Sequence, residues 1–156
     1  MATSVSLGKS RYTRARVSAY AWSRTAFAVG HVVSVQMPFD ILSDTEPNPD
    51  LAVVVGSPRD YASANPTTAA LIVEVADSSL FLDTTTKAEK YATAGVQDYW
   101  VIDLENRQLI VFRDPAPLPA DLGANAYRQR NTFGPDATVS PLAAPEAVVR
   151  VGDLLP

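Results

Sequence analysis

Apolar residues in this chain gather in short runs separated by polar turns, and most of these runs have the length of a strand. Residues 51–55 and 71–76 are almost continuously apolar and rich in β-branched side chains, which is typical of strands covered on both faces of a sheet. Four further segments combine apolar or alternating residues with flanking turn signals and are predicted as strands. They are residues 32–37, 99–103, 108–113 and 127–132.

One helix is predicted between the third and fourth strands, over residues 83–94. Asp83 or Thr84 offers an N-cap, and Gly95 occupies the place of a left-handed residue after the last turn. A strand, a helix and a strand of these lengths form a right-handed crossover between parallel strands. We therefore predict an α/β fold with a mixed central sheet, this crossover and a C-terminal hairpin. The hairpin strands are residues 99–103 and 108–113, and a Pro-rich surface loop is predicted over residues 114–126.

Charge is distributed unevenly along the chain. Residues 1–39 contain five basic side chains and no acid, whereas residues 40–156 hold eight basic side chains against 17 acids. Residues 17–29 fit a short helix, although strand alternation fits almost as well. We predict a basic leader over residues 1–30, either disordered or folded as a short helix, and a single domain over residues 31–156. A basic arm of this kind suits contact with phosphate groups.

Composition excludes several kinds of site. The absence of Cys rules out disulfides, thiolate metal sites and cysteine nucleophiles, and the single histidine, His31, rules out a multi-histidine zinc site within one chain. No run of 18 apolar residues is present, so we expect no membrane span and a cytoplasmic protein.

Two carboxylates lie where the pattern predicts buried strands. Asp50 stands directly before residues 51–55, and Glu74 is the single charge within residues 71–76. Because an ionised carboxylate is costly to bury without a partner, two of them in such positions indicate a bound cation. Mg²⁺ and Mn²⁺ prefer oxygen ligands, and they neutralise the charge that develops on a phosphate when a phosphodiester is cleaved. Asp50 and Glu74 would share one cation if their strands pair.

A lysine follows on the predicted helix. Lys87 lies 13 residues after Glu74, and its ammonium is expected to return toward the same site, where it would orient the attacking water or stabilise the transition state. Asp83, Lys87 and Tyr91 are spaced at i, i+4 and i+8 and therefore share one helix face. Asp83 is more typical of a helix cap, and Tyr91 of a core residue whose hydroxyl touches the site. Both are accessory candidates.

Four short segments follow one another in order between residues 49 and 103. They are Pro49-Asp50, Val73-Glu74-Val75, Asp83-x₃-Lys87-x₃-Tyr91-Ala92 and Gly95-Val96-x-Asp98-Tyr99-Trp100-Val101-Ile102-Asp103. Each segment is weak alone, but the ordered set over about 55 residues is specific. It resembles the putative restriction endonuclease family of the PD-(D/E)XK nuclease superfamily, which is widespread in bacteria such as cyanobacteria.

The resemblance implies a restriction-endonuclease-like core and Mg²⁺- or Mn²⁺-dependent endonuclease cleavage of DNA by a homodimer. It also implies that Asp50 and Glu74 bind the metal ion, with the backbone carbonyl of Val75 as a third ligand. In the superfamily motif a lysine lies two residues after the second acid. That place is Ala76 here, so Lys87 would be a catalytic lysine relocated to the helix.

The N-terminal part of the chain departs from the family pattern. Family members have a longer region before the first core strand, including a helix that carries a Glu, whereas residues 1–39 here contain no acid. An alternative prediction is therefore a catalytically inactive, N-terminally truncated remnant of the fold that acts as a binding or regulatory domain. A second alternative is a protein-interaction domain that uses the hairpin around Asn106.

Overall fold

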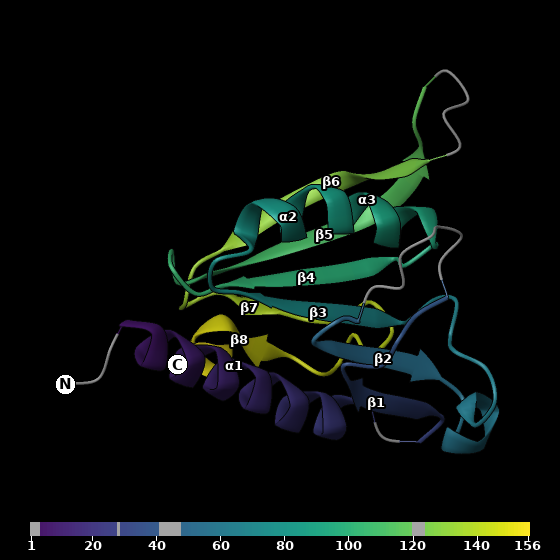
Figure 1. Ribbon diagram of the computed structural model, residues 1–156, viewed down its shortest axis with the longest axis horizontal. Helices are drawn as coiled ribbons and strands as arrows, with labels where there is room; N and C mark the ends of the chain where they lie inside the picture. The colour runs from purple at the N-terminus through teal and green to yellow at the C-terminus, as the bar shows by residue number, and fades with distance from the viewer. Residues whose placement is uncertain (1–3, 28, 41–47, 120–123) are drawn as a thin grey trace.

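A six-stranded mixed sheet forms the centre of the computed structural model, which describes residues 4–27, 29–40, 48–119 and 124–156 (Figure 1). The order of the strands in the sheet is their order in the chain, and every neighbouring pair is antiparallel except β3 and β4, which are parallel. The predicted α/β class with a mixed sheet is confirmed. The strands are β1 (His31–Val35), β2 (Leu51–Val55), β3 (Leu71–Ala76), β4 (Asp98–Asp103), β5 (Gln108–Pro117) and β6 (Asn125–Phe133).

Helices cover both faces of this sheet (Figure 1). One face packs against α1 (Ser4–Ala26) and the C-terminal segment, and the other against α2 (Leu80–Thr84) and α3 (Thr86–Thr93), which connect β3 to β4. The remaining elements are the 3₁₀ helices η1 (Pro58–Tyr61) and η2 (Val151–Leu154) and a small antiparallel sheet of β7 (Thr138–Val139) and β8 (Val149–Arg150).

The two covered faces explain the continuous apolar run of β3. Leu71, Val73 and Val75 belong to the core cluster on the α1 side, whereas Ile72 belongs to the cluster on the α3 side. Side chains alternate across a strand, so Glu74 points into the α3 layer. All six residues of β3 are buried, and Glu74 is the single charged group of this otherwise apolar strand.

The connection between β3 and β4 differs in part from the predicted single helix. The helix begins at Leu80 rather than Asp83, and a break at Thr85, with φ −121° and ψ −86°, divides it into α2 and α3. The prediction that Asp83 is an N-cap is wrong, because its N–H already donates to the Ser79 carbonyl within α2 at 2.9 Å.

The predicted end of this helix is confirmed. Gly95 has a φ of +78° and donates its N–H to the carbonyl of Ala92, while Val96 donates to the carbonyl of Tyr91, each at 3.0 Å. These two bonds form a Schellman motif, which needs a residue in the left-handed region at the position of Gly95.

At the N-terminus, α1 is longer than the short helix predicted over residues 17–29, since it extends from Ser4 to Ala26. Ala15 and Ala19 are fully buried against the sheet, and the Trp22 ring stacks on Trp100 with centroids 5.4 Å apart. No helix among the described residues, α1 included, is both long and apolar enough to cross a membrane. Whether residues 31–156 fold as a domain without α1 stays a prediction.

Part of the predicted Pro-rich loop is strand. β5 continues to Pro117 and β6 begins at Asn125, although residues 120–123 lie outside the described part of the chain. Pairing with β4 ends at Arg113, so the last residues of β5 have a neighbour on one side only. Proline lacks the N–H that a second neighbour would need, and it is tolerated at such an edge.

We predict that replacing Trp22 destabilises the whole protein. Trp22→Ala removes the stacking on Trp100 and part of the α1 interface, and should lower the free energy of unfolding by about 2 kcal/mol. Val17→Ala is the matched control, because Val17 lies on the same helix but is 60% exposed; its effect should stay within about 0.5 kcal/mol. Urea unfolding followed by far-UV circular dichroism measures both. Equal stabilities would mean that α1 does not unfold together with the sheet.

Candidate active site

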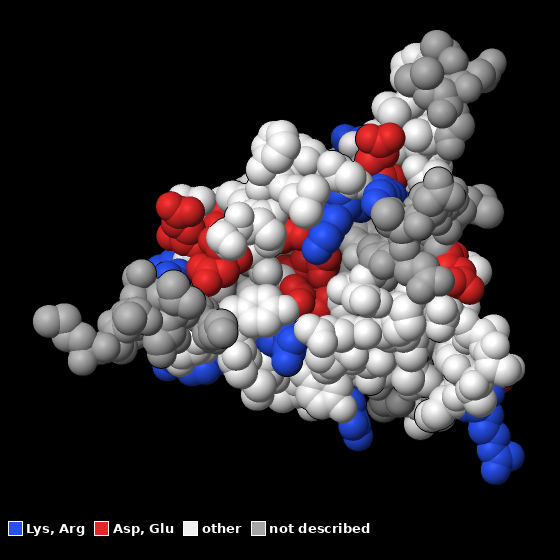
Figure 2. All heavy atoms as spheres, in the orientation of Figure 1, with Lys and Arg blue, Asp and Glu red and all other residues white. Residues whose placement is uncertain are grey.

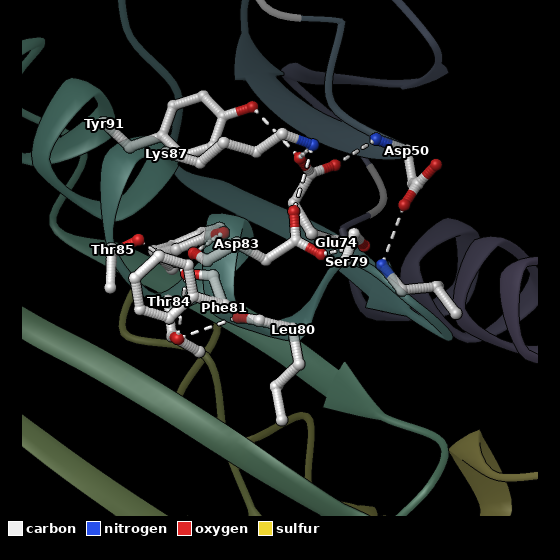
Figure 3. Close-up of polar contacts among 12 residues, drawn as sticks. Asp50, Glu74, Ser79, Leu80, Phe81, Asp83, Thr84, Thr85, Lys87 and Tyr91 are labelled. Carbon is white, nitrogen blue, oxygen red and sulfur yellow. Dashed lines mark hydrogen bonds and ion pairs between the residues drawn. The ribbon is translucent and has the colours of Figure 1, made fainter.

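Asp50 and Glu74 meet at one end of the β2–β3 pair. The register places Leu51 opposite Val73, so Asp50, one residue earlier, comes beside Glu74. The N–H of Asp50 donates to Glu74 Oε1 at 2.7 Å, and the N–H of Val75 donates to Asp50 Oδ2 at 2.8 Å (Figure 3). Antiparallel pairing thus brings together two carboxylates that are 24 residues apart in sequence.

Lys87 reaches the same place from α3. Its Nζ lies 2.7 Å from Glu74 Oε2 and 3.0 Å from Asp83 Oδ1. Both carboxylates are 1% exposed, whereas the lysine side chain is 29% exposed. One partly open ammonium therefore bridges two buried acids from β3 and α2, as Figure 3 shows.

The two accessory candidates also face this cluster. Asp83 accepts a hydrogen bond from Ser79 Oγ at 2.6 Å, and its main-chain carbonyl accepts one from the hydroxyl of Tyr99, also at 2.6 Å. The carboxylate that was predicted to cap a helix therefore fixes Lys87 instead. Tyr91 is buried and its hydroxyl lies 3.4 Å from Glu74 Oε2.

Burial dominates the electrostatics of the site. It raises the pKa of Glu74 to about 7, and the nearby charge of Asp50 acts in the same direction, while Lys87 opposes the shift. Burial by itself lowers the pKa of Lys87, but its contacts with Glu74 and Asp83 outweigh this and raise the pKa above its ordinary value. Lys87 therefore stays charged, whereas Glu74 exchanges its proton near neutral pH.

The donors at this point fit a hard divalent cation. Asp50, Glu74 and the Val75 carbonyl offer only oxygen, which Mg²⁺ and Mn²⁺ prefer. The carbonyl of Ala76 accepts a bond from Leu104 on the β4 side, so the Val75 carbonyl points to the opposite, β2 side of the strand, the side on which the Val75 N–H donates to Asp50. The described residues contain no group of three or more His, Cys, Asp or Glu that could hold a metal ion. One or two carboxylates with water molecules are sufficient for Mg²⁺.

Sequence reasoning missed one residue of the site, Tyr12 of α1. Its hydroxyl donates to Asp50 Oδ1, so both oxygens of this carboxylate accept a hydrogen bond. The four-residue steps from Tyr12 to Arg16 and Tyr20 place these side chains along one side of a helix. That signal becomes usable only when the helix is known to extend back to Ser4.

Three other polar residues, Asp98, Asp103 and His31, make contacts outside this cluster. Asp98 is buried, but it serves the structure by accepting bonds from Trp100 Nε1 at 2.7 Å and Arg113 Nε at 2.9 Å. Asp103 begins the hairpin turn as expected, since it accepts bonds from Asn106. The His31 ring contacts Phe27, with centroids 5.3 Å apart.

Comparison with known proteins supports a nuclease relationship. The sequence profile of the Uma2 family, described as putative restriction endonuclease, matches residues 10–151. None of the curated proteins compared with the chain matches it.

A solved structure has the same fold. It is the crystal structure of a putative nuclease belonging to DUF820 from Anabaena variabilis, with a TM-score of 0.65 and 16% sequence identity. The superposition covers 92% of this chain and 79% of that chain. At this identity the likeness concerns the fold, and the six-stranded sheet with its parallel β3–β4 pair is shared architecture.

We predict that Glu74 makes the stability of the metal-free protein fall as pH rises. Its folded-state pKa of about 7 lies above the ordinary value of 4.5, so the folded protein holds this proton more tightly than the unfolded chain does. The stabilisation is complete below pH 4.5 and is lost as pH rises through about 7, a loss of about 2–3 kcal/mol.

Urea unfolding in EDTA at pH 5 and pH 8 tests this. The wild type should lose about 2–3 kcal/mol more than Glu74→Gln between the two pH values. Glu89→Gln, at an exposed position on α3, should behave as the wild type does. The same pH dependence in wild type and Glu74→Gln would contradict the prediction.

Proposed function

The chain belongs to the putative restriction endonuclease family, and from this premise we propose that it is a divalent-cation-dependent endonuclease that hydrolyses phosphodiester bonds of DNA. The observation that carries the proposal is the convergence of Asp50, Glu74 and Lys87 on one point. A merely structural ion pair would need Lys87 and Glu74 but not a second carboxylate beside them, because adding a like charge raises the energy of the pair.

Asp50, Glu74 and the Val75 carbonyl would hold Mg²⁺ or Mn²⁺. Such an ion, when bound, neutralises charge on the phosphate and makes a water molecule more nucleophilic. Glu74 and Asp50 are held rigidly for this role, since the main-chain N–H groups of Asp50 and Val75 fix their carboxylates at 2.7 and 2.8 Å. Preorganised ligands of this kind do not have to reorient during the reaction.

Lys87 would act on the substrate side of the cluster. Its side chain is the most exposed of the three that form the two ion pairs, so we place the substrate on the Lys87 side of the cluster. Its contact with Glu74 Oε2 at 2.7 Å keeps that ammonium beside the scissile group, where it can donate a hydrogen bond to the attacking water or to a phosphate oxygen. Asp83 and Tyr91 would be positioning residues that hold Lys87 and Glu74.

The main alternative is a non-catalytic domain of the same fold that binds or regulates. One observation favours it: the oxygens of Asp50 and Glu74 already accept bonds from Tyr12, Lys87 and main-chain N–H groups. Glu74 Oε2 accepts from both Lys87 and Tyr91, but Glu74 Oε1 and the two Asp50 oxygens each accept one of these bonds and keep a second lone pair for a cation. The hairpin alternative is weaker, because Asn106 donates its amide back to Asp103 at 2.8 Å.

A homodimer and a cytoplasmic location stay predictions. Cutting both strands of a duplex needs two sites, and a second copy of the chain would provide the second one. Size-exclusion chromatography with light scattering gives the oligomeric state directly.

We expect the protein to nick supercoiled plasmid in Mg²⁺ or Mn²⁺ and not in EDTA. Asp50→Ala, Glu74→Ala and Lys87→Met should each lower the rate by about 100-fold or more, since they remove ligands or a transition-state contact. Glu89→Ala on the same helix as Lys87 is the control and should retain the wild-type rate. Equal nicking by wild type and Glu74→Ala would identify a contaminating nuclease and would contradict the proposed endonuclease function.

Thermal unfolding separates the proposed enzyme from its alternative. A cation at ten times its dissociation constant should stabilise the wild type by about 1.4 kcal/mol and leave Glu74→Ala unchanged. Stabilisation without nicking would favour the binding or regulatory domain. If the cation causes neither stabilisation nor nicking, the proposed metal site is rejected.

A further inference from the structure

Two tyrosine–arginine pairs follow one another along α1. The guanidinium carbon of Arg16 lies 5.4 Å from the centre of the Tyr12 ring, and that of Arg24 lies 5.8 Å from the Tyr20 ring. Arg24 Nη1 also donates to the Tyr20 hydroxyl at 3.0 Å. These four residues, spaced four apart, are called the tyrosine–arginine stripe below.

The arginines of the stripe keep their charge available. Among the described residues, no carboxylate lies within ion-pair distance of Arg16 or Arg24, whereas Arg113, Arg128 and Arg150 are paired with aspartates. Residues 1–39 contain no acid that could neutralise them. Figure 2 shows basic side chains at intervals along the lower edge of the molecule, whose left part is formed by α1, and acidic side chains above them. The stripe is thus a positive surface on a protein with a net charge of −4.

One end of the stripe lies at the candidate active site. The Tyr12 hydroxyl donates to Asp50 Oδ1, so the first pair borders the acids directly. A helix rises 1.5 Å per residue, which gives about 18 Å from Tyr12 to Arg24. That length corresponds to about five phosphates of one strand, at about 3.4 Å of helix axis for each phosphate.

The stripe is also held in place relative to the site. Ala15 and Ala19 are buried between its members and the sheet, and Trp22 stacks on Trp100. On the other side of Tyr12, the Arg11 guanidinium donates to the Leu104 carbonyl at 2.6 Å. These contacts therefore fix α1, and with it the backbone of Tyr12, relative to the sheet.

We infer that the tyrosine–arginine stripe binds the phosphate backbone of the nucleic acid and leads it to Asp50 and Glu74. This inference rests on the proposed nuclease function and extends it to the substrate-binding surface. A guanidinium binds phosphate through paired N–H donors, and the tyrosine ring beneath it limits the rotamers that the arginine would lose on binding. Tyr12 is in addition a positioning residue for Asp50, because a hydrogen bond to a metal-binding carboxylate fixes its orientation.

Binding of labelled duplex DNA, measured by fluorescence anisotropy in EDTA between 50 and 200 mM salt, tests the inference without involving the metal site. For Arg16→Gln/Arg24→Gln, the slope of log affinity against log salt should become shallower by about two, one for each lost phosphate contact. Affinity at about 100 mM salt should fall about tenfold or more. Arg16→Lys/Arg24→Lys should keep most of the slope and bind less tightly, because lysine retains the charge but not the planar fork.

The control is Arg14→Gln/Arg130→Gln, which changes the net charge by the same amount. Arg14 lies half a turn from Arg16 on α1, and Arg130 lies over the Phe112 ring at 5.4 Å, on the far edge strand β6. An equal loss in both double variants would mean that net charge alone governs binding and would overturn the inference. Absence of wild-type DNA binding at 50 mM salt would overturn it too. Circular dichroism melting confirms that each variant is folded.

The two proposals fail separately. Metal-dependent nicking that is lost in Glu74→Ala, together with unchanged DNA binding by Arg16→Gln/Arg24→Gln, supports the enzyme and rejects the stripe. Loss of binding in that double variant, together with equal nicking by wild type and Glu74→Ala, supports the stripe and rejects the enzyme.

Discussion

The negative charge of a carboxylate enclosed between a sheet and its helices needs a positive group or hydrogen-bond donors beside it. Many contacts in this structure meet that need for Glu74. β3 is buried along its whole length, so water cannot solvate the group. Lys87 supplies the opposite charge at 2.7 Å, and Asp83 in turn holds the lysine at 3.0 Å. Because removing Lys87 would leave both Glu74 and Asp83 buried without this cationic partner, the connection from β3 through α2 to α3 is constrained by electrostatics as well as by packing.

Asp50 links this cluster to the opposite layer. It lies before the first residue of β2, where the strand pair opens, and there Tyr12 from the α1 side reaches one of its oxygens. The α3 side reaches Glu74 through Lys87 and Tyr91. The two acids therefore stand where both helical layers meet at the end of a strand pair.

Family membership and fold describe this protein at different levels. The fold is shared with the structure described as a putative nuclease from Anabaena variabilis at 16% identity, a level at which most side chains differ. The N-terminal helix α1 of this chain contains no acid, and its Tyr12 contacts Asp50. A substrate-binding surface can be built on such a helix while the chemistry stays on the sheet, since the two parts are fixed to each other by the Trp22–Trp100 stacking.

Sequence alone predicted the six strands of the central sheet, the helix end at Gly95 and the proximity of Asp50, Glu74 and Lys87, because each leaves a local signal. Apolar runs indicate strands covered on both faces, and a glycine after a helix indicates a left-handed residue. A single charged residue in an apolar run indicates a buried charge that needs a partner. Tertiary structure decided the rest. The full extent of α1 and the contact between Tyr12 and Asp50 depend on burial against strands far away in sequence. Asp83 became an ion-pair partner rather than a cap, since the chain enters α2 three residues earlier than its pattern indicates. The prolines of β5 can lie in a strand because β4 does not extend past Asp98, which pairs with Arg113. The extent of the neighbouring strand, and not a signal in the prolines themselves, decides this.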